Sequence, residues 1–79
     1  MNYKMTQKEE ILQYLKDHGS ITPMDAFYDL GITKLATRIS EMRREGIEFD
    51  IKMEKHRNKY NTRTVRYARY SLCEVKENG

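Results

Sequence analysis

A change of periodicity at Gly46 constrains the fold more than any other feature of this chain. Before Gly46, capping residues and glycines divide the sequence into short stretches whose apolar residues recur at helical spacing. After it, apolar and charged residues alternate over positions 47–54, as in an antiparallel strand with one buried face. The sequence therefore predicts an α+β domain in which helices precede a β-hairpin. The predicted buried face of the first strand consists of Ile47, Phe49, Ile51 and Met53.

Capping residues define the first helix and the link that follows it. Thr6 and Glu9 match a capping box, in which each side chain accepts a hydrogen bond from the backbone N–H of the other residue. The helix is predicted to run to about His18 and to end at Gly19. The next two residues, Ser20-Ile21, are predicted to be extended and long enough for one strand pairing.

Two further helices are predicted before the change of period. Thr22 is a suitable N-cap for the second, Pro23 fits its first position because the missing N–H costs nothing there, and Gly31 ends it after about two turns. The third helix is predicted over residues 33–45, with Thr33 as its N-cap and a left-handed glycine at its end. Two short helices joined by a three-residue turn that opens on glycine are a helix-turn-helix signature.

Helical spacing also predicts the core of the domain. Ile39 and Met42 fall within about 40° of Leu35 around the axis of the third helix, so the three side chains form one apolar stripe. We expect this stripe to pack against the apolar faces of the first two helices. The other predicted core residues of the helical part are Ile11, Leu12, Leu15, Ala26, Phe27, Leu30 and Ile32.

The second strand is predicted over residues 65–72, where the alternation resumes. Residues 55–64 interrupt the pattern with charged residues and asparagines, and we expect them to form a long basic loop at the tip of the hairpin. The hairpin needs support from the helices, because an isolated two-stranded hairpin is marginal in water. Residues 73–79 are predicted to be frayed. In the second strand the predicted inward residues are Ala68, Tyr70 and Leu72, and the predicted outward residues are Tyr67 and Arg69.

Length and composition predict one small intracellular domain. We expect residues 1–79 to form a single domain with an ordered core over about residues 5–72. The one cysteine, Cys73, cannot form an internal disulfide, which fits a reducing compartment. The N-terminus lacks the apolar run of a signal peptide, and no stretch approaches transmembrane length. These features favour the cytoplasm and no membrane association.

The net charge of +3 is unevenly distributed along the chain. Residues 1–33 carry three lysines and five acidic residues, a net charge of −2, and residues 34–51 carry four residues of each sign. Residues 52–79 carry eight basic and three acidic residues, a net charge of +5. This distribution gives the domain a preferred side for an anionic partner, most commonly nucleic acid. An acidic protein surface and an anionic membrane are the alternatives.

The sequence contains no recognisable catalytic or metal-binding arrangement. His18, His56 and Cys73 lack the spacing of metal ligands, and there is no glycine-rich phosphate loop. We therefore expect this chain not to be an enzyme and to bind neither a cofactor nor a metal.

The predicted order of elements is helix, short strand, helix, helix, strand, loop, strand, which is the order of a winged helix-turn-helix. Several stretches are also similar to the small winged helix-turn-helix proteins of bacteriophages and prophages of Gram-positive bacteria. This resemblance covers about residues 5–72 and implies a DNA-binding protein, either a transcriptional regulator or an accessory protein. The stretches that carry it are Thr6-Gln7-Lys8 with Ile11-Leu12, Gly19 to Ala26, Leu30-Gly31-Ile32, Arg38-Ile39, Met42 to Gly46 and Tyr67 to Leu72.

The third helix carries side chains suited to reading double-stranded DNA. Lys, Thr, Arg, Ser and Glu on its outer face have the donors and acceptors needed for base edges and phosphates in a major groove. The residues predicted to read bases are Lys34, Thr37, Arg38 and Glu41, with the head group of Arg38 at the solvent edge of the helix. The residues predicted to contact the DNA backbone or a minor groove are Ser40, Arg43, Arg44, Lys55, Arg57, Lys59, Tyr60 and Arg63.

A second class of function remains open from the sequence. Winged helices also serve as protein-interaction modules, such as a phage-encoded inhibitor that binds a host protein and mimics or blocks a nucleic-acid contact. Glu41 and Glu45 make the outer face of the third helix electrically mixed, which supports this alternative. RNA is a lesser alternative, because a groove-reading helix does not fit the deep, narrow groove of A-form duplexes.

Overall fold

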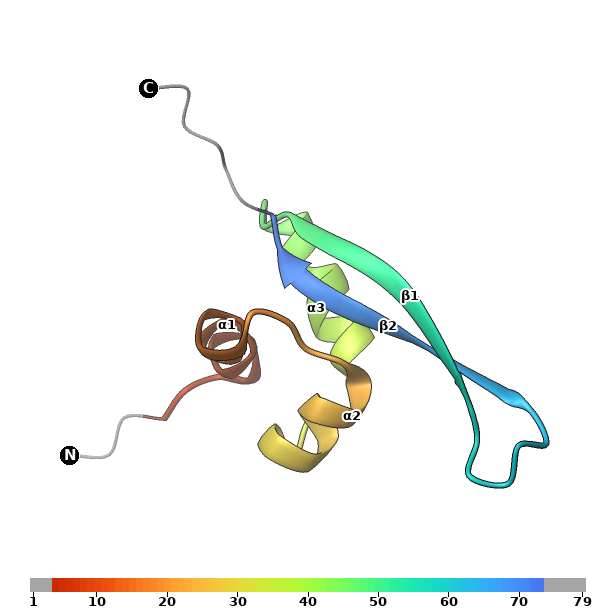
Figure 1. Ribbon diagram of the computed structural model, residues 1–79. Helices are drawn as coiled ribbons and strands as arrows, with labels where there is room; N and C mark the ends of the chain where they lie inside the picture. Colours follow the sequence, from red (N-terminus) through yellow and green to blue (C-terminus); the bar gives the residue numbers. More distant parts are fainter. Residues whose placement is uncertain (1–3, 74–79) are drawn as a thin grey trace.

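The computed structural model describes residues 4–73 and has the predicted order of elements (Figure 1). Three helices are followed by an antiparallel hairpin, which we call the wing, and the predicted α+β fold is confirmed. The helices gather beside one end of the wing, whose other end projects away from them (Figure 1). In chain order the elements are α1 (Gln7–His18), α2 (Pro23–Asp25), the π-helical turn η1 (Ala26–Leu30), α3 (Leu35–Arg44), β1 (Phe49–Arg57) and β2 (Thr64–Leu72).

Helix α1 begins and ends where the capping residues predict. The backbone N–H of Glu9 donates to Thr6 Oγ1 at 3.2 Å, and the N–H of Thr6 donates to Glu9 Oε1 at 2.8 Å, so the capping box is confirmed. Gly19 ends the helix in the left-handed conformation, with φ 88°, and its N–H donates to the carbonyl of Leu15 at 2.8 Å.

Helix α2 and the turn η1 form one continuous helical segment. Thr22 and Asp25 make a second capping box, with N–H to side-chain distances of 3.0 and 3.1 Å. The segment then widens, so that the N–H of Ile32 donates to the carbonyl of Ala26, six residues earlier, at 2.9 Å. Gly31, with φ 69°, ends the segment as predicted.

The predicted burial of Phe27 is wrong. Its side chain is 51% exposed and lies edge to face with the ring of Tyr28, at a centroid distance of 5.3 Å. Ala26 and Ile32, joined by the long-reaching hydrogen bond of η1, fill the space behind this segment and are 0% and 1% exposed. Because successive residues of a helix point in different directions around its axis, the turn that directs Ala26 inward leaves Phe27 facing outward.

The predicted N-cap of α3 is also wrong. The helix begins at Leu35, the cap position is occupied by Lys34, and no side chain bonds the N–H groups of the first turn. Ile32 is buried, and its N–H bonds the carbonyl of Ala26. Thr33 and Lys34 then connect Ile32 to the first residue of α3, so Thr33 lies one residue before the cap position. The other end agrees with the prediction, since Gly46 is left-handed with φ 102°.

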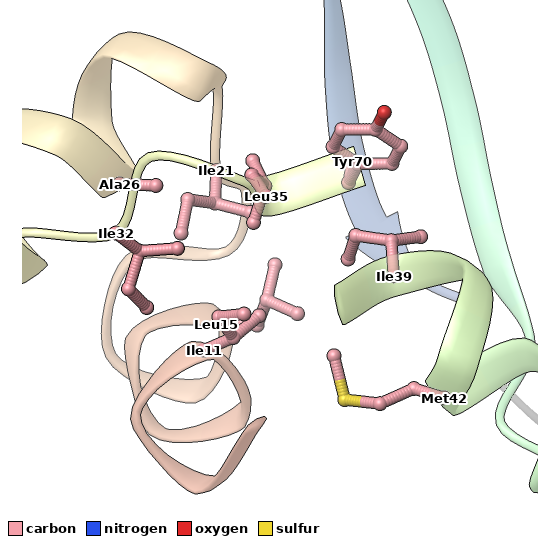
Figure 2. Close-up of a cluster of buried hydrophobic side chains, with 9 residues drawn as sticks. All are labelled: Ile11, Leu15, Ile21, Ala26, Ile32, Leu35, Ile39, Met42 and Tyr70. Carbon is pink, nitrogen blue, oxygen red and sulfur yellow. The ribbon is translucent and has the colours of Figure 1, made fainter. Parts of the chain in front are cut away.

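The core lies between the three helices and the base of the wing (Figure 2). Leu35, Ile39 and Met42 of α3 are at most 2% exposed, so the predicted stripe is confirmed. Figure 2 shows Tyr70 of β2 beside Ile39, which brings the wing into the same core. The remaining buried hydrophobic residues are Ile11, Leu15, Ile21, Ala26 and Ile32, with Leu12, Leu30, Ala68 and Leu72 partly buried against them.

A short backbone bridge fastens the wing to the helices. The N–H of Ile21 donates to the carbonyl of Tyr70, and the N–H of Tyr70 donates to the carbonyl of Ile21, both at 2.9 Å. The strand pairing predicted for Ser20-Ile21 is thereby confirmed. Within the wing, β1 and β2 pair from Phe49 opposite Leu72 to Arg57 opposite Thr64.

The wing differs from the prediction in two respects. Its strands continue to Arg57 and Thr64, so the predicted loop over residues 55–64 shrinks to a tip over residues 58–63. The predicted core position of Met53 is wrong, because that side chain is 68% exposed, and Ile51 is 43% exposed. The wing extends past the helices at its outer end (Figure 1), and no helix covers the side chain of Met53 there.

On the face of the wing that does not carry Tyr70, the side chains are less exposed than predicted. Tyr67 and Arg69 are half-buried, and Arg69 donates to Ser20 Oγ and to Glu54 Oε1, each at 2.9 Å. The bond to Glu54 raises the pKa of Arg69 and lowers the pKa of Glu54. A groove of about 490 Å³ lies beside this face, with Pro23, Met24, Val65 and Tyr67 among its lining residues.

The predicted frayed tail begins one residue too early. Cys73 is half-buried, and its N–H donates to the carbonyl of Glu48 at 3.1 Å, which continues the pairing beyond β2. Residues 74–79 of the predicted tail lie outside the described residues.

A hydrogen bond between α1 and η1 gives a testable pH dependence. Tyr14 Oη donates to Asp29 Oδ2 at 2.6 Å, and this bond, aided by burial and by the charges of Asp25 and Asp29, raises the pKa of Tyr14 to about 12. Because the folded-state pKa is raised, the stabilisation is complete below the ordinary pKa of 10.0 and is lost as the pH rises towards 12. We expect Tyr14→Phe to lower the free energy of unfolding by about 1 kcal/mol at neutral pH.

Urea unfolding of the parent and of Tyr14→Phe at pH 7, 10 and 11 tests this expectation. The difference between the two proteins should shrink above pH 10, whereas a constant difference would show that the Tyr14–Asp29 bond does not stabilise the protonated phenol. Asp29→Asn keeps an oxygen acceptor and removes the charge, so it should show a smaller pH dependence than the parent.

Candidate nucleic-acid interface

The outer side of α3 presents an exposed polar surface. Thr37, Ser40, Arg43 and Arg44 are exposed, as is Lys34 at the start of the helix. Ser40, Arg43 and Arg44 together line a shallow depression on this side. Among residues 4–73, none of the three basic side chains forms an ion pair. The surface can therefore offer cationic and hydroxyl groups to an anionic ligand without first breaking an internal contact.

Glu41 of α3 and Glu45, the residue that follows the helix, both pair with Lys8 of α1. Lys8 Nζ lies 2.7 Å from Glu45 Oε2 and 3.6 Å from Glu41 Oε1, and Arg38 Nη1 lies 2.9 Å from Glu41 Oε1. The hydrogen bond to Glu45 raises the pKa of Lys8 above its ordinary value. Because two basic residues offset both carboxylates, the outer side of α3 is more positive than its sequence indicates.

Arg38 does not sit at the solvent edge as predicted. Its side chain is half-buried beside Thr6, Gln7 and Lys8, and its Nε is buried without a hydrogen-bond partner. The helical wheel places residues 38, 41 and 45 on one flank of α3, and α1 packs along that flank. The four residues predicted to read bases are thus divided: Lys34 and Thr37 are exposed, whereas Arg38 and Glu41 bond each other.

The wing carries the second set of exposed basic residues. Lys55 and Arg57 lie in β1, and Lys59 and Arg63 lie in the tip. All four are exposed, and none forms an ion pair within the described part of the chain. Tyr60, also in the tip, is 76% exposed, with Lys59 Nζ 5.7 Å from its ring centre.

Arg66 belongs with these basic residues, although it is not among the DNA-contacting residues predicted from the sequence. It lies opposite Lys55 in the wing and is exposed. Alternation places both on the same face as Tyr70, the face that packs against α3 at the base of the wing. The alternation of the strand places Arg66 on the same face as the predicted inward residue Ala68, two positions later, so its position beside Lys55 could be predicted from the sequence.

The tip is a closed, hydrogen-bonded turn rather than an open loop. Arg57 Nε donates to Asn61 Oδ1 at 2.6 Å, and Arg57 Nη2 donates to the carbonyl of Asn61 at 2.7 Å. Asn58 and Thr62 form two hydrogen bonds, each 2.9 Å long: Asn58 Nδ2 donates to Thr62 Oγ1, and the backbone N–H of Thr62 donates to Asn58 Oδ1. Asn61 is left-handed, with φ 57°, a conformation that asparagine tolerates better than most residues. These bonds present the cationic tip as a preformed shape.

Other kinds of site find little support in the part of the chain that the structure describes. No group of three or more His, Cys, Asp and Glu side chains is placed to hold a metal ion among residues 4–73. The Cys73 thiol is half-buried, and burial together with a 3.5 Å contact to Asp50 raises its pKa, so it is protonated at neutral pH. None of the described helices has the length and hydrophobicity needed to cross a bilayer.

Comparison with known proteins agrees with this architecture. A protein-family model described as "Winged helix-turn-helix domain" matches residues 6–75, which is most of the chain. No curated protein and no solved structure matches the sequence.

Proposed function

This chain belongs to the winged helix-turn-helix domain family, and from that premise we propose that it binds double-stranded DNA with α3 in the major groove and the wing on the DNA backbone or in a minor groove. The observation that carries the proposal is the division of charge on α3. Its acidic residues are paired with Lys8 and Arg38, whereas Arg43 and Arg44 are exposed and unpaired among the described residues. A winged helix-turn-helix domain indicates DNA binding rather than catalysis.

The exposed residues at the start of α3 are proposed to read bases. Lys34 suits an acceptor on guanine, and Thr37 suits the methyl group of thymine. Arg38 and Glu41 remain proposed readers of guanine and of a cytosine amine, but they would first have to exchange their mutual 2.9 Å bond for contacts with DNA. The preference for a DNA sequence should therefore depend more on Lys34 and Thr37 than on Arg38 and Glu41.

The backbone contacts are assigned to the remaining basic and polar residues. Contacts of this kind orient a protein on DNA without reading its sequence. Arg66 joins the set because it lies beside Lys55 on the face of the wing that continues from α3. The proposed set is Ser40, Arg43, Arg44, Lys55, Arg57, Lys59, Arg63 and Arg66, with Tyr60 against a sugar.

The biological role follows from the resemblance described above. We propose a phage or prophage transcriptional regulator, or an accessory DNA-binding protein, acting in the cytoplasm of a bacterial host. This role rests on the similar sequence stretches, and selection from a bank of phage or prophage promoter fragments would test it.

Binding to a mixed-sequence duplex at increasing salt tests the proposed interface. Fluorescence anisotropy should show log affinity falling linearly with log salt concentration, because each neutralised phosphate releases counterions. Arg44→Ala should weaken binding to all sequences alike and reduce the magnitude of this slope by about one unit. Lys16→Ala is the matched control, since it removes the same charge from the exposed side of α1 and should leave the slope unchanged.

Two outcomes would contradict the proposal. Equal slopes for the parent and Arg44→Ala would remove the outer side of α3 from the interface. Failure of the parent to bind any duplex at low salt would reject DNA binding and favour the alternative of a module that binds a host protein.

A further inference from the structure

Strand β1 has one unpaired edge within residues 4–73. Strand β2 occupies its other edge, and β2 in turn bonds Ile21, so the order across the sheet is β1, β2 and then the bridge residue. Phe49 and Glu54 are half-buried, and every other residue of β1 is exposed. A nine-residue exposed edge is a template for pairing with another strand.

The hydrogen bonds at the two ends of the wing show which backbone groups face this edge. The N–H of Asn58 donates to the carbonyl of Arg63, and the N–H of Cys73 donates to the carbonyl of Glu48. Because bonded pairs alternate along an antiparallel ladder, the even-numbered residues of β1 bond β2. Tyr70, which lies opposite Ile51, is consistent with this pattern, because its N–H and C=O groups bond Ile21 rather than β1. The N–H and C=O groups of residues 49, 51, 53, 55 and 57 therefore point to the free edge.

We propose that two copies of this chain pair through their β1 edges, antiparallel, about a two-fold axis at Met53. In this register each residue meets a compatible partner, and the residues with free backbone groups face one another, so both strands satisfy their outward N–H and C=O groups. The pairs between the copies are Phe49 with Arg57, Asp50 with His56, Ile51 with Lys55, Lys52 with Glu54, and Met53 with Met53.

Charge complementarity selects this register over its neighbours. Opposite charges directly across an antiparallel pair stabilise it, and like charges destabilise it. With the axis at Met53 no like charges face each other along β1. Neighbouring registers place like charges opposite each other. With the axis at Lys52, Glu54 or Lys55, that residue faces the same residue of the other copy. With the axis at Ile51, Glu48 of one copy faces Glu54 of the other.

The same pairing accounts for the exposed apolar residues of β1. Ile51 and Met53 are 43% and 68% exposed, although they occupy the middle of a strand. In the proposed dimer Met53 lies against its copy, and Ile51 lies diagonally across from Met53 of the other chain, within reach for contact. On the opposite face, Lys52 of one copy meets Glu54 of the other, which already accepts a bond from Arg69.

The proposed dimer has a defined shape. A two-fold axis perpendicular to the joined sheet keeps equivalent faces on the same side, so both α3 helices lie on one side of four continuous strands. This inference does not rest on DNA binding, and it is tested without DNA.

Sedimentation equilibrium of the full chain, from micromolar to millimolar concentration, tests the pairing. The parent should form dimers. Met53→Pro should raise the dimer dissociation constant by about tenfold or more, because two hydrogen bonds are lost by symmetry. Proline is tolerated here within one chain, since the N–H of Met53 points away from β2. Met53→Ala is the control for the side chain, keeps the N–H, and should weaken the dimer less.

A charge exchange provides the second test and does not use proline. Lys52→Glu opposes Glu54 of the other copy and should dissociate the dimer, while the new carboxylate faces Arg69 within its own chain. Adding Glu54→Lys should restore the dimer. Circular dichroism and thermal unfolding of each variant control for folding. A monomer at all concentrations, or a dimer unaffected by both Met53→Pro and Lys52→Glu, would overturn the proposal.

Discussion

Replacing Ile39 with alanine is expected to lower the free energy of unfolding by about 2–5 kcal/mol. Ile39 is 2% exposed and lies between the helical core and Tyr70 of the wing (Figure 2), so its removal leaves a cavity that three elements border. A domain of 79 residues has a total stability of about 4–12 kcal/mol. The variant should therefore be close to unfolded at room temperature or show a much lower denaturation midpoint.

Ile51→Ala is the matched control, because it removes the same atoms from a side chain that is 43% exposed. It should cost about 1 kcal/mol or less. Urea unfolding followed by circular dichroism, at low protein concentration, compares the two variants with the parent. Equal midpoints for Ile39→Ala and the parent would show that the assigned face of α3 is wrong.

The second large effect is expected from the wing. Replacing Lys55, Lys59 and Arg63 together with alanine should weaken binding to every duplex sequence and reduce the magnitude of the log-salt slope by about three units. Arg57 is kept, because its bonds to Asn61 close the tip and their loss would change the shape of the wing as well as its charge. Salt titrations monitored by anisotropy measure the effect.

A charge-preserving variant separates electrostatics from shape in this experiment. Exchanging the same three residues as Lys55→Arg, Lys59→Arg and Arg63→Lys keeps every positive charge and should keep the slope of the parent. If the log-salt slope falls in both the alanine variant and the charge-preserving variant, the effect comes from altered wing structure. An unchanged slope in the alanine variant would exclude the wing from the interface.

Local capping chemistry made most of the fold predictable. The box at Thr6, the N-cap at Thr22 and the glycines that end the three helices act within a few residues of the chain, so their partners can be read from spacing alone. The helical stripe of α3 was predictable for the same reason. The failures lie where the widened turn η1 departs from regular helix geometry: the N–H of Ile32 bonds the carbonyl of Ala26, α3 begins only at Leu35, and Phe27 faces outward.

The candidate site was predictable in composition and less so in geometry. Which residues are basic is visible in the sequence, but the pairing of Glu41 and Glu45 with Lys8 joins helices far apart in the chain. Burial of Met53 was wrong because alternation indicates a strand without indicating how far the helices beneath it extend. Arg66, in contrast, could have been assigned from alternation.

The bridge between Ile21 and Tyr70 has a consequence for how the chain reaches its native state. The two residues exchange two backbone hydrogen bonds although nearly all the described chain after α1 lies between them. Closing so long a loop costs entropy before the contacts form, so we expect this pairing to form later than the helices. A nascent chain that has emerged only as far as Gly46 lacks Tyr70, which is both the donor and the acceptor for the backbone groups of Ile21. We therefore expect the helices and the wing to unfold together, because they share one core and are joined by this bridge.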